Sequence, residues 1–163
     1  MSGIELRKYN SRDATATLAV FLAAVTETAA RDYSPEQIAA WARPGQRELI
    51  DWDESRRTLN TYVAILDGNV AGFSDVSAAG YIDMMFVAPR YGRRGVGATL
   101  LSFLERSTPA SVLAADVSIT ARPFFEAHGF VVEAEQHPRI VGVRMTNFRM
   151  TKQLRPGGLS TDS

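Results

Sequence analysis

A short basic glycine loop, Pro89 to Leu101 (PRYGRRGVGATLL), has the residue types and spacing best suited to bind a ligand. An apolar run from Ile82 to Val87 precedes the loop and a helical apolar pattern follows it, which predicts a strand, a loop and the first turn of a helix. A helix start carries unpaired N–H groups and a partial positive charge. Gly95 and Gly97 let a ligand approach the backbone, and the Arg93-Arg94 pair adds charge. The combination suits a phosphate or pyrophosphate.

The spacing of the glycines excludes two common phosphate-binding motifs. A P-loop has Lys followed by Ser or Thr after its last glycine, whereas Val96-Gly97-Ala98 follows Gly95 here. A dinucleotide fingerprint lies at an early strand-to-helix turn, whereas Gly92, Gly95 and Gly97 lie in the middle of the chain. The segment Arg93 to Ala98 resembles instead the acetyl-CoA loop of the GNAT superfamily of N-acetyltransferases, [Q/R]-x-x-G-x-[G/A]. Gly92 departs from it, because it stands at the Gln or Arg position.

A second segment, Ser118 to Phe130, resembles the C-terminal GNAT signature N-x-x-A-x-x-L-Y-E-K-x-G-F. The matching positions are Ala121, Glu126, Gly129 and Phe130, while Ser118 replaces Asn and Phe124 replaces Leu. Phe125 stands where many members carry the Tyr thought to protonate the departing CoA thiolate. The phrase Phe-Phe-Glu-x-His-Gly-Phe is similar to that of a bacterial subgroup in which Phe is usual at this site.

The resemblance implies an acetyl-CoA-dependent N-acetyltransferase that acts by direct transfer on a primary amine of a small molecule or peptide. It also implies that the backbone at Met85, Phe86 and Val87 lines the pantetheine arm and that the loop holds the pyrophosphate. The implied cofactor-binding residues are Met85, Phe86, Val87, Arg93, Arg94, Gly95, Val96, Gly97, Ala98, Ser118, Phe124 and Phe125.

The candidate catalytic residues lie on the strand before the loop. Because side chains alternate along a strand, Tyr81, Asp83, Met85 and Val87 are expected to share one face. Asp83 is flanked by apolar residues, so we expect it to be partly desolvated with a raised pKa, which suits a general base. The alternative is a structural Asp bonded to backbone or to an Arg. Tyr81 is a poorer base that can relay a proton through water or bind the amine, or it is only an edge residue.

The general acid and the acceptor site are less well defined. Phe125 has no proton to donate, which leaves water, Tyr33 or Tyr81, and a thiol pKa of about 8.5 makes the thiolate a tolerable leaving group. The acceptor site is expected between the N-terminal helices and the last hairpin, with Tyr33, Trp41 and Trp52 as wall residues or, alternatively, as core. Two histidines without a supporting carboxylate pattern give no reason to expect a metal.

Composition bounds the class of protein. The 163 residues suffice for one domain, and 18 basic residues balance 18 acidic ones, so nothing indicates nucleic acid or a membrane surface as a partner. There is no cysteine, which excludes a disulfide and a thiol nucleophile. No apolar run approaches 18 residues and no signal segment is evident, so we expect a cytoplasmic protein. Many relatives of this kind are dimers, so a homodimer is a further expectation.

The elements that position these residues follow a β-α-α-α-β-β-β-α-β-α-β-β order. Strands are expected at 4–9, 58–66, 70–76, 81–87, 111–117, 130–135 and 141–154, the last with a bulge near Asn147; helices are expected at 13–31, 34–44, 46–56, 95–107 and 119–128. This α/β (α+β) order is like the GNAT fold, which implies a mostly antiparallel mixed sheet of about six or seven strands, with a splayed βαβ acetyl-CoA site and flanking helices. We expect one domain at 1–154 and a flexible tail at 155–163.

Two other functions fit part of the sequence. Phe125 at the Tyr position favours a non-catalytic acyl-CoA-binding sensor or interaction module, which would bind acetyl-CoA without turnover. The basic glycine loop alone also fits a nucleotide-phosphate binder unrelated to CoA.

Overall fold

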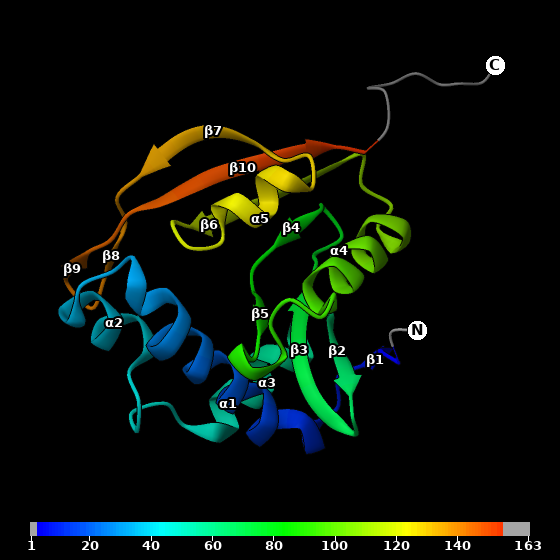
Figure 1. Ribbon diagram of the computed structural model, residues 1–163, viewed down its shortest axis with the longest axis horizontal. Coiled ribbons are helices and arrows are strands. Elements are labelled where there is room, and N and C mark those ends of the chain that lie inside the picture. The colour runs from blue at the N-terminus through cyan, green and yellow to red at the C-terminus, as the bar shows by residue number, and fades with distance from the viewer. Residues whose placement is uncertain (1–2, 155–163) are drawn as a thin grey trace.

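The computed structural model describes residues 3–154, so the tail expected at 155–163 lies outside the described residues. The chain forms a mixed α+β fold, as expected, with its helices packed around two main sheets (Figure 1). The helices are α1 (Ala14–Ala23), α2 (Pro35–Ala42), α3 (Leu49–Thr58), α4 (Val96–Ser107) and α5 (Arg122–Ala127). The strands are β1 (Glu5–Lys8), β2 (Thr61–Leu66), β3 (Asn69–Asp75), β4 (Tyr81–Ile82), β5 (Met85–Val87), β6 (Val112–Ser118), β7 (Val131–Gln136), β8 (Arg139–Ile140), β9 (Val143–Arg144) and β10 (Asn147–Gln153).

Local signals in the sequence set several element boundaries. Helix α2 begins with a capping box, in which the Ser34 side chain accepts from the Gln37 amide and the Gln37 side chain accepts from the Ser34 amide. The β2–β3 hairpin turns at Asp67 and Gly68, whose φ angles of 55° and 77° suit the tight turn that their residue types favour. The cap and the turn therefore lie where the expected helix 34–44 begins and where the expected strands 58–66 and 70–76 meet.

The helical stretch expected at 13–31 is present but irregular. It begins with a 3₁₀ turn at Ser11–Asp13 and continues through α1, a π-helical turn at Ala24–Thr28 and a second 3₁₀ turn at Ala29–Arg31. Within the described residues, the helical stretch Ser11–Arg31 is 21 residues long and apolar enough, by length and composition, to cross a membrane. Length and composition alone are weak evidence for a span, and the apolar side chains of α1 pack in the core here, with Val20 and Phe21 buried.

The strand expected at 81–87 is broken. Its first part, β4, pairs in parallel with β6 in the sheet β4-β6-β10-β7, and its second part, β5, pairs with β3 in the sheet β1-β2-β3-β5. Asp83 and Met84 form the break, through which the chain passes from the upper sheet of Figure 1 to the lower one. A continuous strand over 81–87 would pair with β6 along its whole length. Because the strand is broken, β5 instead diverges from β6.

The strand expected at 141–154 is also split. Residues 139–144 form the small β8–β9 hairpin, which turns at Val141 and Gly142, and β10 begins only at Asn147. The bulge expected near Asn147 is a break at Met145 and Thr146, and a register shift against β7 follows between Arg149 and Met150.

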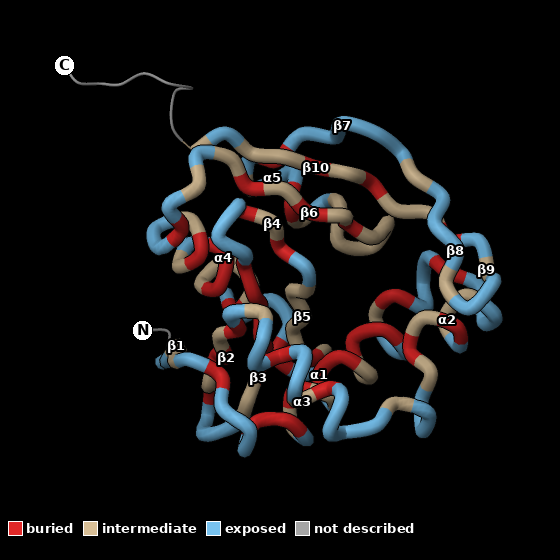
Figure 2. The backbone as a smooth tube through the Cα atoms, turned by 180° about the vertical axis from the view of Figure 1, so that it is seen from behind, coloured by how far each residue is buried: buried red, intermediate tan, exposed pale blue. Residues whose placement is uncertain are grey.

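Each main sheet has its own buried cluster. Phe21, Phe73 and Leu100 belong to the cluster on the first sheet, while Leu113, Phe125 and Met150 belong to the cluster on the second. Helix α4 packs in both clusters, with Leu100 in one and Leu104 in the other. Figure 2 shows buried backbone in both halves and exposed backbone along the edge strand β7.

Candidate functional site

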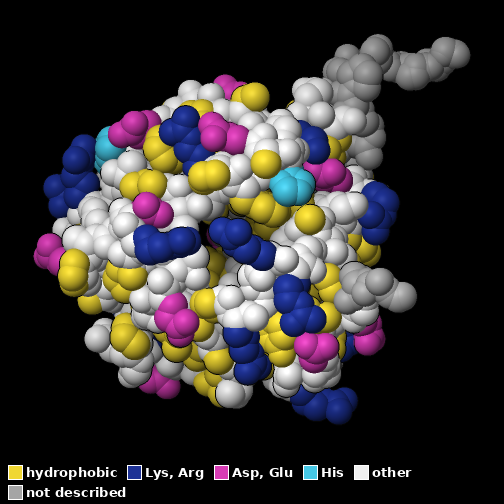
Figure 3. Space-filling model, viewed as in Figure 1, with side chains coloured by type: hydrophobic (Ala, Val, Ile, Leu, Met, Phe, Trp, Pro, Cys, Tyr) yellow, Lys and Arg dark blue, Asp and Glu magenta, His cyan; other side chains and the backbone are white. Residues whose placement is uncertain are grey.

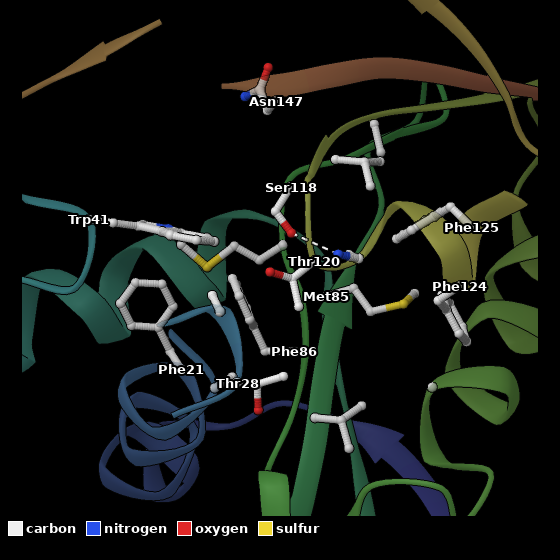
Figure 4. A pocket seen from close by; sticks show the side chains of 18 of the residues that line it. Phe21, Thr28, Trp41, Met85, Phe86, Ser118, Thr120, Phe124, Phe125 and Asn147 are labelled. Carbon is white, nitrogen blue, oxygen red and sulfur yellow. Dashed lines mark hydrogen bonds between the residues drawn. The ribbon is translucent and has the colours of Figure 1, made fainter. Parts of the chain in front are cut away.

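A cavity of about 880 Å³ lies where β5 and β6 diverge. Both sheets, the π-helical turn, α5 and the β8–β10 segment contribute to its walls. Figure 3 shows the hollow near the middle of one face, with basic side chains on either side of it. In Figure 4 Met85 points toward Phe124 and Phe125, whereas Phe86 lies beside Phe21 and Trp41.

Only some residues of the glycine loop line this cavity. Arg93, at a φ of 62°, lines the cavity and forms no ion pair within residues 3–154. Gly95 has a φ of 86° and precedes the first residue of α4, so the chain enters this helix through a left-handed residue, a conformation that glycine adopts without strain. Gly97 lines the cavity, and a Cβ placed there would lie 3.2 Å from the Phe124 ring.

Eight of the twelve expected cofactor-binding residues line the cavity: Met85, Phe86, Val87, Arg93, Gly97, Ser118, Phe124 and Phe125. Arg94, Gly95, Val96 and Ala98 are absent from its lining. Arg94 lies 3.5 Å from the Asp67 carboxylate, on the β2–β3 hairpin, and Val96 is buried in the core. The loop thus presents Arg93 and Gly97 to the cavity, while its second arginine is directed elsewhere.

Ser118 has a local structural partner. Its Oγ accepts a hydrogen bond of 3.0 Å from the Ala121 amide, and so caps the turn that leads into α5 (Figure 4). Phe125 packs edge-to-face on Phe124 and Phe130 and is 5% exposed. The phenyl ring at the usual Tyr position is therefore part of the core as well as of the cavity wall.

Asp83 lines the cavity and is more exposed than the expected partial desolvation implies. Its side chain is 44% exposed, and its Oδ2 lies 3.8 Å from Nη2 of the buried Arg56. The expectation that Tyr81, Asp83, Met85 and Val87 share one face fails, because the chain breaks at Asp83–Met84. Tyr81 is not among the lining residues, and side chains of both strand phases, including Phe86, reach the cavity.

Tyr81 belongs to a polar network on β6 and β10 that was not anticipated. Its hydroxyl donates to Asp116, 2.8 Å away, and Asp116 also accepts from Arg149 at 2.7 Å and Gln136 at 2.9 Å. Burial and the Asp116 carboxylate raise the pKa of Tyr81. Burial opposes ionisation of Asp116, yet its three hydrogen-bond donors outweigh burial and lower the pKa of Asp116. Asp116 lines the cavity, and the available sequence signal for it was that it is the only charged residue of this strand.

The two expected acceptor-site residues meet at the cavity. Tyr33 and Trp41 both line it and their rings pack edge-to-face at 5.5 Å. The Tyr33 hydroxyl donates to the Thr146 carbonyl at 2.6 Å and accepts from the Ile119 amide at 2.9 Å, and burial raises its pKa. Trp52, by contrast, is a core residue whose indole N–H donates to Thr17.

The described residues 3–154 contain no group of three or more His, Cys, Asp or Glu side chains that could hold a metal ion.

Comparison with known proteins gives concordant matches. The family model described as an acetyltransferase (GNAT) domain matches residues 29–152. The uncharacterized N-acetyltransferase YafP of Escherichia coli K12 is 42% identical over 150 residues, which are 92% of this chain and 96% of YafP.

Solved structures share the fold. A GCN5-related N-acetyltransferase from Rhodopseudomonas palustris superposes with a TM-score of 0.89 at 35% identity, covering 94% of this chain and 97% of that one. The PaiA N-acetyltransferase of Thermoplasma acidophilum, solved in complex with coenzyme A, gives a TM-score of 0.67 at 21% identity, covering 92% and 98%.

Proposed function

The chain belongs to the GNAT acetyltransferase family, and from that premise we propose that it moves an acetyl group from acetyl-CoA to a primary amine of a small molecule or peptide. The observation that carries this proposal is the cavity between the diverging strands β5 and β6. The basic glycine loop contributes Arg93 and Gly97 to its lining, and Asp83 lines the same cavity.

Acetyl-CoA supplies the activated acetyl group, and the residues of the loop would hold its pyrophosphate. Arg93 is a cation that has no ion pair within residues 3–154, and the start of α4 offers unpaired backbone N–H groups. The backbone of β5 from Met85 to Val87 would line the pantetheine arm, with Phe124 and Phe125 opposite. The divergence of β5 from β6 leaves its backbone polar groups on that side available to the cofactor.

The chemistry assigned to the site is direct attack of the amine nitrogen on the thioester carbon. Asp83 takes the proton that the amine loses, the C–N bond forms, and the C–S bond breaks to release CoA as a thiolate. Asp83 suits this role because it lines the cavity and is half-exposed, so the incoming amine can reach it.

Protonation of the thiolate is assigned to water. Tyr33 already donates its hydroxyl proton to a backbone carbonyl, and Tyr81, which is not a lining residue, already donates its own to Asp116. Phe125 has no proton to give. A leaving group with a pKa of about 8.5 departs at neutral pH without an acid held in place.

Incubation with acetyl-CoA and a panel of primary amines, while free thiol release is followed, tests the proposal. Acetylated product with one thiol per product is the expected result. No product from any amine, together with no acetyl-CoA binding by calorimetry, would reject it.

The second candidate is a non-catalytic acyl-CoA-binding sensor, which the buried Phe125 at the usual Tyr position favours. Tight acetyl-CoA binding without turnover across the whole amine panel would select it.

A further inference from the structure

The break at Asp83–Met84 leaves backbone groups outside both sheets, and Asp75 provides their hydrogen-bond partners. Oδ1 of Asp75 lies 2.7 Å from the Asp83 amide nitrogen and 3.4 Å from that of Met84. The Asp75 amide donates to the Met84 carbonyl at 3.2 Å, and the Ser74 hydroxyl donates to the same carbonyl at 2.8 Å. The end of β3 therefore holds the broken segment through four hydrogen bonds.

Arg56 of α3 connects the same carboxylate to Asp83. Its Nη1 lies 3.2 Å from Oδ2 of Asp75 and its Nη2 lies 3.8 Å from Oδ2 of Asp83. Arg56 is 2% exposed and Asp75 is 1% exposed, so the pair is shielded from water, whereas Asp83 extends from it into the cavity wall. One buried guanidinium thus lies between a buried carboxylate and a half-exposed one.

Strand β5 does not depend on this arrangement. It pairs with β3 at three positions, from Gly72 opposite Val87 to Ser74 opposite Met85, and the Ala88 amide donates to the Ala71 carbonyl at 2.8 Å. If the Asp75 carboxylate were lost, the amides of Asp83 and Met84 would lose their acceptor, while the two bonds to the Met84 carbonyl and the ladder of the strand assigned to the cofactor would remain.

We propose that Asp75 is a positioning residue, which together with Arg56 fixes the carboxylate of Asp83 at the cavity wall. Asp75 does not itself meet the substrate, because it is buried and does not line the cavity. The inference rests on the proposed role of Asp83 as the base, and it assigns to Asp75 and Arg56 the placement of that base.

The first test is structural and does not depend on activity. In Asp75→Ala, exchange of the Asp83 and Met84 amides, followed by NMR in D₂O, should be faster by about tenfold or more, while the Ala88 amide stays protected. Asp75→Asn keeps an oxygen that can accept these amides, so it should retain most of their protection. Val63→Ala, a buried change in the same sheet, is the control for lost stability and should not single out these two amides.

The second test is a kinetic cycle on the full chain, assayed below the melting temperature of every variant. Asp75→Ala should lower kcat by about tenfold or more and leave the acetyl-CoA Kd within about threefold. If Asp75 acts through Asp83, the double variant Asp75→Ala/Asp83→Asn should be within about threefold of Asp83→Asn alone.

The outcomes separate the two proposals. Unchanged exchange at Asp83 and Met84 in Asp75→Ala, or losses that multiply in the double variant, would overturn the positioning role and leave the proposed function standing. Full activity of Asp83→Asn would instead remove the base from the proposed function and, with it, the catalytic part of this inference.

Discussion

The position of Asp83 is set by its contacts with Asp75 and Arg56, because its side chain is not buried. It is exposed enough for an acceptor to reach, and its nearest cation is the buried Arg56. A base in this setting gains its effect from position, because a proton acceptor must lie within hydrogen-bond reach of the attacking amine. The competing interpretation, a carboxylate that only balances Arg56, predicts a loss of stability instead of a loss of rate.

Asp83→Asn separates these two interpretations, because it keeps the shape of the side chain and removes the proton acceptor. We expect kcat/KM to fall by on the order of 100-fold and the acidic limb of the pH profile to change, with the acetyl-CoA Kd within about threefold. Steady-state kinetics across the neutral pH range and calorimetry measure these quantities. A variant that loses melting temperature and activity together, with an unchanged pH profile, would identify Asp83 as structural.

Asp75 makes stability depend on pH. Burial raises the pKa of Asp75 to about 6, although the Asp83 amide and Arg56 act in the opposite direction. A carboxyl group whose pKa is higher in the folded than in the unfolded protein binds its proton more tightly when folded. Its stabilisation is complete below the unfolded value of 3.8 and is lost as the pH rises through about 6. The difference corresponds to about 3 kcal/mol.

Asp75→Asn removes this dependence, because Asn does not titrate. The wild type should therefore exceed the variant in unfolding free energy by more at about pH 4.5 than at about pH 7.5, with a change of about 2 kcal/mol between the two. Urea unfolding at both pH values gives the two differences. A gap that widens with pH would instead show that the ion pair with Arg56 dominates.

At the scale of elements, the loop before α4 was predictable because its signals are local. Glycine spacing, adjacent arginines and the helical pattern that follows all lie within Pro89–Leu101, and the capping box at Ser34 is similarly short-range. The break at Asp83–Met84 was not predictable, since it depends on Asp75 and Arg56, which belong to other elements. The same holds for the network at Asp116, whose partners come from three other strands.

The loop prediction concerns Gly95, which has a φ of 86° and open space where a Cβ would stand, with no atom within 4 Å other than those of its chain neighbours. Gly95→Val should weaken acetyl-CoA binding by more than about tenfold, because the strained backbone shifts the amides at the start of α4. Gly68→Val is the matched control: it has a φ of 77° and equally open surroundings, but lies in the β2–β3 hairpin. Calorimetry on both variants compares them, and equal losses of affinity would mean that the effect is not specific to the loop.

At the scale of the whole molecule, the cavity lies between two sheets that have separate buried clusters. The segment 81–87 runs from one sheet to the other. Its first part, β4, forms only two residue pairs with β6, so this segment is attached to the upper sheet by few ladder contacts. A ligand that contacts both β5 and α5 therefore adds a connection between them. Its binding energy should appear as stability of the whole fold, because a ligand that binds only the folded state shifts the unfolding equilibrium.

Thermal unfolding with and without ligand measures this coupling and also identifies the ligand. At a concentration of about 100 times Kd, acetyl-CoA should stabilise the fold by about 2.7 kcal/mol, which for a chain of this size raises Tm by about 5–10 °C. ATP at the same concentration should raise Tm much less, because it shares the phosphates of CoA but has no pantetheine arm to lie between β5 and α5. Gly95→Val should show a smaller acetyl-CoA shift than Gly68→Val. If ATP protected as well as acetyl-CoA or better, the loop would belong to a nucleotide-phosphate site, and the cavity between the sheets would lose its assigned ligand.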